Sequence, residues 1–428
     1  MVEPMVLFCL FVFVILILLE IPIPFSMIAS SSIYAIYNNQ SALMFAQRTA
    51  ASFSDYSLLA IPTFIFVGCY MNAIGLSDKI FNFCVKLLGR IPGGLAHANI
   101  LGSMVFAGMS GSALADAGGL GVIEVKAMKY AGYDEEFAVA TTAASSTIGP
   151  IIPPSINLVV YGFMAQVPTI SLFIGGFLPG VLMGITMMIW IAFGISKNKI
   201  KAPKASPYPL KVKLASFIDA IPALIAPLLL TGGILSGAFT ATECGCIACL
   251  YLLIVAIFYK RLKWNIIVDS LKQTITTTAM VVFLIATGSI FNWMIITGGF
   301  ITYLTDALLA LNSTWLILMV FNIILLIMGC FMGGMPILIM MIPLIVNLAN
   351  SLELNLVHLG VVVVLNLTLG LITPPMAPSL FTTCRVTGVS FEGALKQVWQ
   401  FLIPLFVTLF LTTYIPDLVL WLPRVFGV

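Results

Sequence analysis

The stretch IGPIIPPS occupies residues 148–155, and a near copy, LGLITPPM, occupies residues 369–376. Each stretch follows a long apolar run, and the two Pro-Pro pairs stand 221 residues apart. A proline pair after a glycine interrupts the hydrogen-bond ladder of a helix and frees backbone carbonyls. In hydrocarbon such a break is tolerated only where it is buried in protein or lines a polar cavity. The duplication therefore predicts two broken membrane helices around a site near the centre of the bilayer.

The composition indicates a polytopic membrane protein. Of 428 residues, 61% are hydrophobic and only 8% are charged, and the mean hydropathy is +1.14, whereas soluble domains carry about 25% charged residues. The net charge of +3 is too small and too dispersed to suggest a nucleic-acid partner. The first apolar run lacks the positive n-region of a secretory signal peptide, so we expect it to be a membrane span.

A second duplication predicts two re-entrant hairpins. GMSGS at 108–112 and CFMGGM at 330–335 stand 223 residues apart when their methionines are matched, and they interrupt the apolar stretches 91–125 and 313–350. Glycine and serine at the centre of such a stretch suit a helix that enters, turns and leaves by the same face. Apolar runs of about 20 residues predict the remaining spans, at 5–24, 57–76, 136–163, 169–195, 215–238, 244–259, 276–297, 356–384 and 395–422.

The distribution of lysine and arginine predicts the orientation. Basic residues flank the first hairpin on both sides and cluster again in 197–213, which we place in the cytoplasm. Between Trp264 and Arg385 the only basic residue is Lys272, so the ends of the second hairpin are expected outside. The halves therefore form an inverted repeat, with 1–196 as the first repeat, 197–213 as a cytoplasmic linker, and 214–428 as a second half that begins with an extra span.

The freed carbonyls and nearby hydroxyls predict sodium sites, because oxygen atoms of unwound helices coordinate this cation. Each break is expected to face its own hairpin, whose glycines let two backbones approach closely. The alternative is that these glycines only pack helices and the prolines only kink them; two motifs in matching positions favour binding. The expected sodium ligands are Gly108, Gly149, Ile152 and Ser155 in the first half, and Gly329, Gly370, Thr373 and Met376 in the second.

Polar residues near the hairpin tips are candidates for substrate binding. Asp116 stands inside an apolar stretch, and an intramembrane carboxylate indicates function, although a role in stabilising the hairpin tip is an alternative. No lysine or arginine lies in the central motifs. An anion would therefore be met by backbone N–H groups and hydroxyls, with sodium supplying positive charge. The expected substrate-binding residues are Ser110, Ser112, Asp116, Asn157, Gly333 and Gly334.

Three segments carry a resemblance to a known family: GMSGSALADAGGLG at 108–121, GYDEEFAVATTAASSTIGPIIPPSINLVVYG at 132–162, and LGLITPPMAPSLF at 369–381. They resemble the large membrane subunit of tripartite ATP-independent periplasmic (TRAP) transporters. The resemblance implies an elevator-type, sodium-coupled importer of an organic acid in a bacterial inner membrane, with at least two sodium sites. Sialic acid is the favoured substrate and a C4-dicarboxylate the next.

The same resemblance implies two protein partners. A soluble periplasmic binding protein would deliver the substrate, and a small four-helix membrane subunit would brace the large one. Because the first span starts within a few residues of Met1, the small subunit is expected to be a separate chain.

Three other functions stay open from sequence. A sodium- or proton-coupled anion symporter that needs no binding protein is the nearest, and a channel is another. An intramembrane hydrolase built on Ser110 would need a base, and only His97 and His358 are available as histidines. We expect no enzymatic activity.

Overall fold

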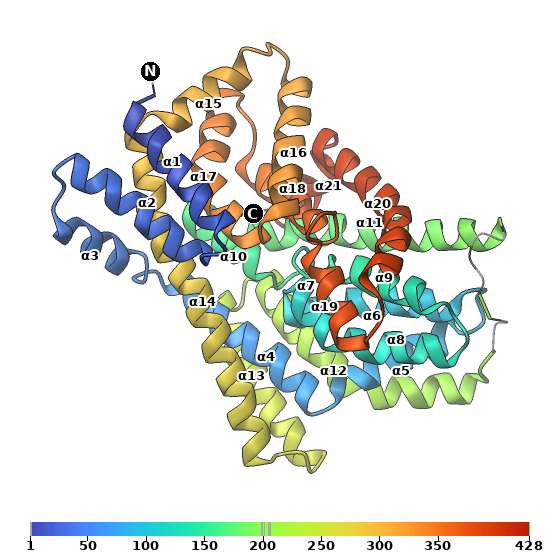
Figure 1. The fold of residues 1–428 in the computed structure, drawn as a ribbon. Helices are drawn as coiled ribbons and strands as arrows, with labels where there is room; N and C mark the ends of the chain where they lie inside the picture. Colours follow the sequence, from blue (N-terminus) through green and yellow to red (C-terminus); the bar gives the residue numbers. More distant parts are fainter. Residues whose placement is uncertain (1, 198–199, 201, 204–206, 428) are drawn as a thin grey trace.

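The computed structural model describes residues 2–197, 200, 202–203 and 207–427, apart from the side chains of Ser110 and Leu235. This part of the chain folds into α-helices and one 3₁₀ turn, and it contains no strand. Eight helical segments within it are long and apolar enough to cross a membrane. The expected all-α, polytopic membrane fold is therefore confirmed, and Figure 1 shows the arrangement of its helices.

The first repeat contains one hairpin and one broken helix, as expected. A glycine-rich tip joins α6 to α7 and α8, and the IGPIIPPS stretch separates α9 from α10. The elements of this repeat are α4 (Ala60–Ala73), α5 (Leu76–Leu88), α6 (Gly94–Ser110), α7 (Ala113–Gly118), α8 (Leu120–Tyr130), α9 (Glu135–Ser146), α10 (Ile156–Ala165) and α11 (Thr169–Ser196).

The second repeat follows the same order after two connecting helices, α12 (Leu210–Leu235) and α13 (Ala241–Phe258). Gly75 and Gly299 mark corresponding corners, since each has a positive φ (78° and 72°) and lies between a spanning helix and a short amphipathic one. The elements are α14 (Trp264–Thr297), α15 (Phe300–Leu309), α16 (Thr314–Phe331), α17 (Gly334–Ser351), α18 (Leu356–Gly370), α19 (Pro378–Thr387) and α20 (Phe391–Tyr414), followed by α21 (Asp417–Phe426).

The N-terminal region differs from the expected single span at 5–24. It forms two antiparallel helices, α1 (Pro4–Leu18) and α2 (Ile23–Tyr37), followed by α3 (Ala42–Ala51) and the 3₁₀ turn η1 (Tyr56–Leu59). Glu20 adopts a positive φ of 62°, and the prolines that follow it begin a new helix instead of continuing the old one. A hydrogen bond of 3.1 Å from Glu3 N to Gly298 O ties this pair of helices to the far end of α14.

Other boundaries also differ from the sequence expectation. The helix expected at 276–297 begins at Trp264, and the span expected at 395–422 is divided between α20 and α21. Hydropathy alone did not predict the amphipathic helices α3, α5 and α15, because a helix that buries one face lacks a continuous apolar run. Part of the expected linker 197–213 lies outside the described residues.

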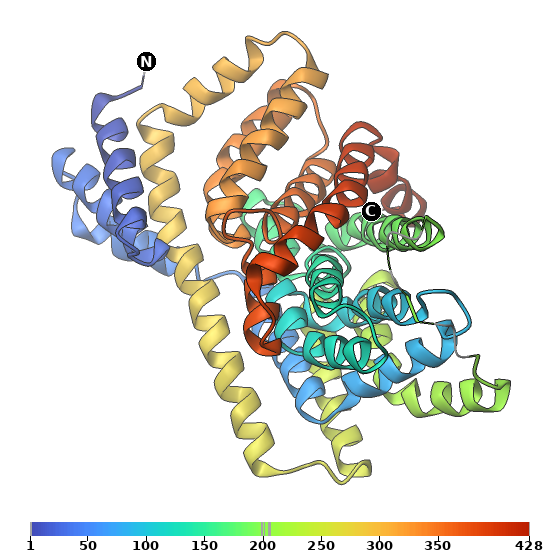
Figure 2. The same cartoon turned by 45° about the vertical axis from the view of Figure 1, so that its right-hand side comes forward.

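The two repeats interlock at their broken helices. The helix after the first break, α10, packs against α17 of the second hairpin, and the helix after the second break, α19, packs against α7 of the first hairpin. The helices before the breaks form the centre of this unit, since every residue of α9 from Phe137 and of α18 from His358 is buried. Figures 1 and 2 both show the long helix α14 with α1–α3 on one side and the second hairpin on the other.

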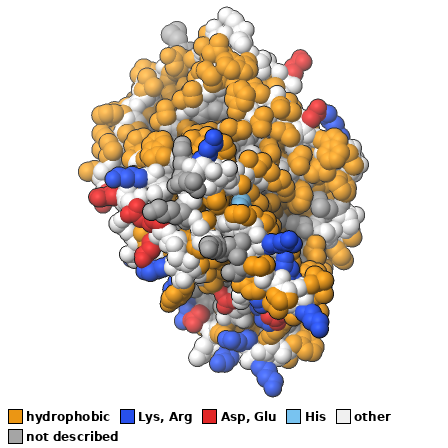
Figure 3. Space-filling model, turned by 90° about the vertical axis from the view of Figure 1, so that its right-hand side faces the viewer, with side chains coloured by type: hydrophobic (Ala, Val, Ile, Leu, Met, Phe, Trp, Pro, Cys, Tyr) orange, Lys and Arg blue, Asp and Glu red, His pale blue; other side chains and the backbone are white. Residues whose placement is uncertain are grey.

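The surface agrees with a membrane protein that has charged ends. Figure 3 shows the side of the molecule on which the connection between α11 and α12 lies. Hydrophobic side chains cover the upper part of this face, and lysine, arginine and carboxylate side chains gather in its lower part.

Candidate functional site: a cavity between the hairpin tips and the helix breaks

The first break packs directly against the tip of the first hairpin. Gly111 at this tip has a φ of 56°, and a Cβ atom built on it would lie only 2.7 Å from the carbonyl oxygen of Pro154. No larger residue fits this turn without a shift of backbone. At the break, Ser155 caps α10 by accepting a hydrogen bond from Leu158 N (3.2 Å), and its hydroxyl donates to Pro150 O at 2.5 Å. The freed carbonyls are thus gathered beside a serine oxygen.

The second break has the same relationship to its own hairpin. Met376 N donates to Cys330 O at 3.3 Å, which joins the break to the end of α16. Gly370 and Gly329 lie in close contact, because a Cβ atom built on Gly370 would be 2.8 Å from the Gly329 backbone. Thr373 donates its hydroxyl proton to Leu369 O at 2.7 Å. Both breaks therefore place a hydroxyl among carbonyl oxygens that a helix would otherwise use.

A cavity of about 310 Å³ lies where the two hairpin tips meet the two breaks. We call it the central cavity. It contains four of the six expected substrate-binding residues, Ser112, Asn157, Gly333 and Gly334. Its other lining residues are Gly111, Ala113, Leu114, Pro150, Ile156, Thr277, Met280, Val281, Leu284, Met335, Pro336, Leu367, Leu371 and Pro378.

One wall of the central cavity was not anticipated from sequence. Thr277, Met280, Val281 and Leu284 all belong to α14. Their spacing of three or four residues places them on one face of the helix. No motif marks this face, and only the position of α14 beside the hairpins identifies it.

The other expected site residues lie around the cavity. Asp116 is 2% exposed and faces the first break, with a carboxylate oxygen 2.9 Å from a Cβ built on Gly149; it does not line the central cavity. Gly108 lies near the carbonyl of Pro153, and Ile152 packs on Gly180. The side chain of Ser110 is outside the described set.

Two buried polar networks fasten each hairpin to its broken helix. In the first half, Ser145 Oγ donates to Asn99 Oδ1 at 2.7 Å, which joins α9 to α6. In the second half, Asn366 Nδ2 donates to Asn322 Oδ1 at 2.8 Å, which joins α18 to α16. These residues are related by the same spacings as the hairpin and break motifs, so the contact itself is duplicated. Asn292, another polar residue of the spans, donates to Ile339 O at 2.9 Å instead of facing the central cavity.

The donor set suits a hard monovalent cation better than a transition metal. Among the described residues no group of three or more His, Cys, Asp or Glu side chains is placed to hold a metal ion. The oxygens at the breaks come from backbone carbonyls, hydroxyls and, near Gly149, the Asp116 carboxylate. Such oxygens can take the place of the water shell of an alkali cation.

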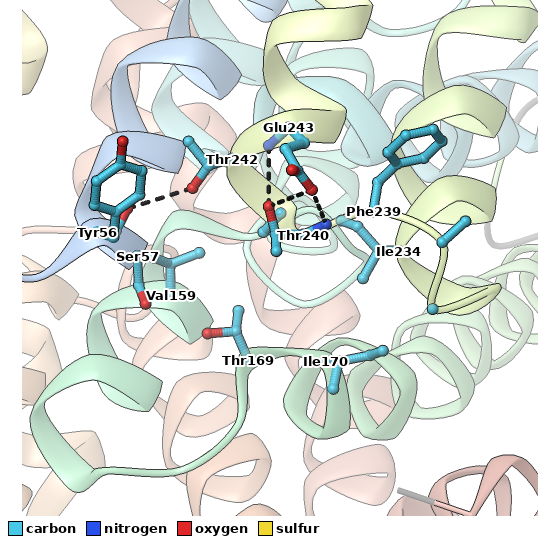
Figure 4. A pocket seen from close by; sticks show the side chains of 13 residues that line it. Tyr56, Ser57, Val159, Thr169, Ile170, Ile234, Phe239, Thr240, Thr242 and Glu243 are labelled. Atoms are coloured by element: carbon cyan, nitrogen blue, oxygen red, sulfur yellow. Dashed lines mark hydrogen bonds between the residues drawn. The ribbon is translucent and has the colours of Figure 1, made fainter.

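A second cavity, of about 460 Å³, lies away from the hairpin tips, and we call it the outer cavity. Figure 4 shows the capping box at its roof, where Thr240 and Glu243 exchange hydrogen bonds at the start of α13, with Tyr56 and Thr169 on other walls. It contains no residue of either break or tip. The central cavity is therefore the better candidate for the functional site.

Comparison with known proteins agrees with this geometry. Residues 10–418 match the family model described as tripartite ATP-independent periplasmic transporter, DctM component. The chain is 37% identical over 409 residues to the sialic acid TRAP transporter large permease protein SiaM of Vibrio cholerae, with 95% of each chain covered. It is 34% identical over 395 residues to the C4-dicarboxylate TRAP transporter large permease protein DctM of Pseudomonas aeruginosa, with 92% of each covered.

Two further comparisons bear on length and fold. The chain is 36% identical to the sialic acid TRAP transporter permease protein SiaT of Haemophilus influenzae and covers 97% of itself but 68% of that longer protein. The crystal structure of the YdaH transporter of Alcanivorax borkumensis has the same fold, with a TM-score of 0.57 at 12% identity over 85% of this chain and 86% of that one. The extent of the family match and the identity to curated large permeases show that this chain belongs to the DctM component family of tripartite ATP-independent periplasmic transporters.

Proposed function

We propose that this chain is the large membrane subunit of a sodium-coupled importer of an organic acid, with sialic acid as the favoured substrate and a C4-dicarboxylate as the next. The observation that carries the proposal is the central cavity, which both hairpin tips and both breaks line together. A site built from two inverted halves belongs to neither side of the membrane and suits alternating access. The identity of 37% to a sialic acid permease supports the substrate preference.

Sodium is proposed as a transported ion at each break. Ser155 with the carbonyls of the first break would hold one ion, and Thr373 with those of the second would hold the other. The ions would order the two hairpin tips and provide positive charge beside the central cavity, whose lining residues include no lysine or arginine. Substrate affinity is then weaker without sodium, and linkage requires sodium affinity to be weaker without substrate.

The moving part is proposed to consist of both hairpins and both broken helices. Their interlocked packing and the two polar networks support movement as one rigid body. The helix α14 and the helices packed on its other side would form the fixed part. Sliding of the first against the second would expose the central cavity alternately to the two faces of a bacterial inner membrane.

Two partners are proposed from the family. A periplasmic binding protein would deliver the acid, and a small membrane subunit would brace the fixed part. A symporter that needs no binding protein is the alternative function, and uptake measurements distinguish the two.

The structure gives no support to a hydrolase. Ser110 and His97 stand at opposite ends of α6, about 20 Å apart at 1.5 Å per residue. His358 Nε2 lies 2.8 Å from Thr412 O, and its ring is buried. Neither histidine is placed to take a proton from a hairpin serine.

The test is uptake of labelled N-acetylneuraminate and of succinate into proteoliposomes that contain this chain and the small subunit. Both acids are offered with and without the binding protein. The proposal expects sodium-driven uptake of one acid that depends on the binding protein. Uptake that ignores the binding protein would favour the stand-alone symporter, and uptake of neither acid would contradict the proposed substrates.

A further inference from the structure

A cavity separate from the central one lies beside the only arginine of the N-terminal helices. It has a volume of about 550 Å³, and we call it the arginine cavity. It lies between α3, α14, α17 and the end of α10, and it is lined by Arg48, Met164, Ser289, Asn292, Trp293, Ile296, Thr297, Ile342, Pro343, Val346 and Asn347. Arg48 is the one charged residue of this lining.

The arginine cavity continues the wall of the central cavity. Both cavities use α14 and α17: the central one ends at Leu284 and Pro336, and the arginine cavity begins at Ser289 and Ile342. At 1.5 Å per residue these steps are about 8 Å and 9 Å along the two helices. A solute in the arginine cavity is thus about two turns away from the central cavity, along the same pair of helices.

Arg48 is held at the rim and has no carboxylate partner. The hydroxyl of Ser52 donates to Ser289 Oγ at 2.9 Å and fixes the end of α3 on α14. The guanidinium lies 5.7 Å from the centroid of the Trp293 ring. No ion pair to Arg48 occurs among the described residues. The guanidinium N–H donors are therefore available to an anion, in a geometry that matches a carboxylate.

The position of Arg48 is unusual for the topology. The orientation indicated by the charge distribution puts only Arg48 and Arg424 outside, of the 19 lysines and arginines. Arg424 is paired with Asp417 at 2.7 Å. Arg48 is the outside cation that is left to meet a solute.

We propose that Arg48 and the arginine cavity form an outer binding site for the carboxylate of the organic acid, on its path to the central cavity. This inference rests on the proposed function. Asn347 is suited to the site because its counterpart in the first hairpin, 223 residues earlier, is Glu124. An amide at this position does not repel a carboxylate, whereas a glutamate would.

The binding test uses Trp293 as a probe in the complex of this chain with the small subunit, in nanodiscs of zwitterionic lipid. N-acetylneuraminate and succinate are titrated, and the Trp293 signal is obtained by subtracting the Trp293→Phe variant. We expect a saturable change that Arg48→Gln weakens by about tenfold or more and that Arg48→Lys largely retains. The methyl ester of N-acetylneuraminate, which lacks the charge, should give no change. Arg424→Gln is the matched control and should behave as wild type.

The uptake test measures the same site by a second route. Arg48→Gln and Asn347→Asp should each raise KM by about fivefold or more at low ionic strength while Vmax stays within about twofold, and high salt should shrink the effect. A wild-type KM and an unchanged Trp293 response in Arg48→Gln would overturn the inference alone. A Trp293 change caused by anionic lipid without either acid would assign Arg48 to lipid phosphate and would also overturn it. A normal Trp293 response without any sodium-driven uptake would instead contradict the proposed function.

Discussion

Ser146 Oγ and Ser379 Oγ lie 2.7 Å apart, both buried, and join the end of α9 to the start of α19. One serine precedes the first break and the other follows the second, so this contact ties the two breaks together. Ser146 already donates its proton to Ala143 O at 2.8 Å. Since a hydroxyl has one proton, Ser379 is the donor in the contact between the two serines.

This direction predicts unequal costs for the two alanine variants. Ser146→Ala leaves the Ser379 hydroxyl buried without its acceptor and should lower the free energy of unfolding by about 1–3 kcal/mol. Ser379→Ala removes only the donor, and Ser146 keeps its own bond, so about 1 kcal/mol is expected. Thermal unfolding of the purified protein in detergent measures both, with Ser54→Ala as an exposed control. A larger cost for Ser379→Ala would contradict the assigned direction.

The contact between Gly370 and Gly329 predicts intolerance of a methyl group. Gly370→Ala places Cβ against the Gly329 backbone, and overpacking of this kind costs about 1–3 kcal/mol. We expect uptake to be lost or the apparent sodium affinity to fall by about tenfold, since one kcal/mol or more acts on the site itself.

Gly232→Ala in α12 is the matched control, because a Cβ atom there meets nothing within 4 Å. This variant should be neutral or stabilised by up to about 1 kcal/mol through helix propensity. Equal uptake by the two variants would show that the close approach at the second break is not required.

Thr373 predicts a specific effect on sodium. Thr373→Val keeps the shape but removes the hydroxyl oxygen, so the sodium concentration that gives half-maximal uptake should rise by about tenfold, while Thr373→Ser should retain wild-type affinity. Thr305→Val is the control, because Thr305 is also buried and makes the same bond to the carbonyl four residues earlier. Unchanged sodium dependence in Thr373→Val would remove Thr373 from the site.

The duplicated polar contact predicts that each hairpin is held by its broken helix. Asn366→Ala removes two hydrogen bonds to Asn322, of 2.8 Å and 2.9 Å, and should lower the free energy of unfolding by about 2–4 kcal/mol. Ser145→Ala, at the corresponding place, removes a smaller group and should cost about 1–2 kcal/mol. Unfolding in detergent ranks the two variants, and a neutral Asn366→Ala would contradict the proposed fastening of α16 to α18.

The sequence predicted the features that depend on local chemistry. Prolines and glycines interrupt helices wherever they stand, so both breaks and both hairpins were visible as motifs, and Ser112, Asn157, Gly333 and Gly334 were correctly expected near one another. Hydropathy marked the long spans because burial in lipid needs a continuous apolar run.

The features that depend on packing were not predictable in this way. The α14 wall of the central cavity has no motif, and Asp116 turns toward Gly149 instead of the cavity because of how α7 packs on the first break. The amphipathic helices α5 and α15 carry a periodic signal that an average over a window removes. Arg48 stood alone in the sequence, and only the fold brings it to Trp293 and α17.

The central claim is that each of the two breaks holds one sodium ion and that both ions act on the cavity between them. It is tested most directly by the initial rate of substrate uptake as a function of external sodium, at fixed ionic strength and zero membrane potential, with the binding protein present. The account predicts a sigmoidal dependence with a Hill coefficient above 1, because occupation of both breaks precedes tight substrate binding. A hyperbolic dependence, or uptake at full rate without sodium, would contradict it.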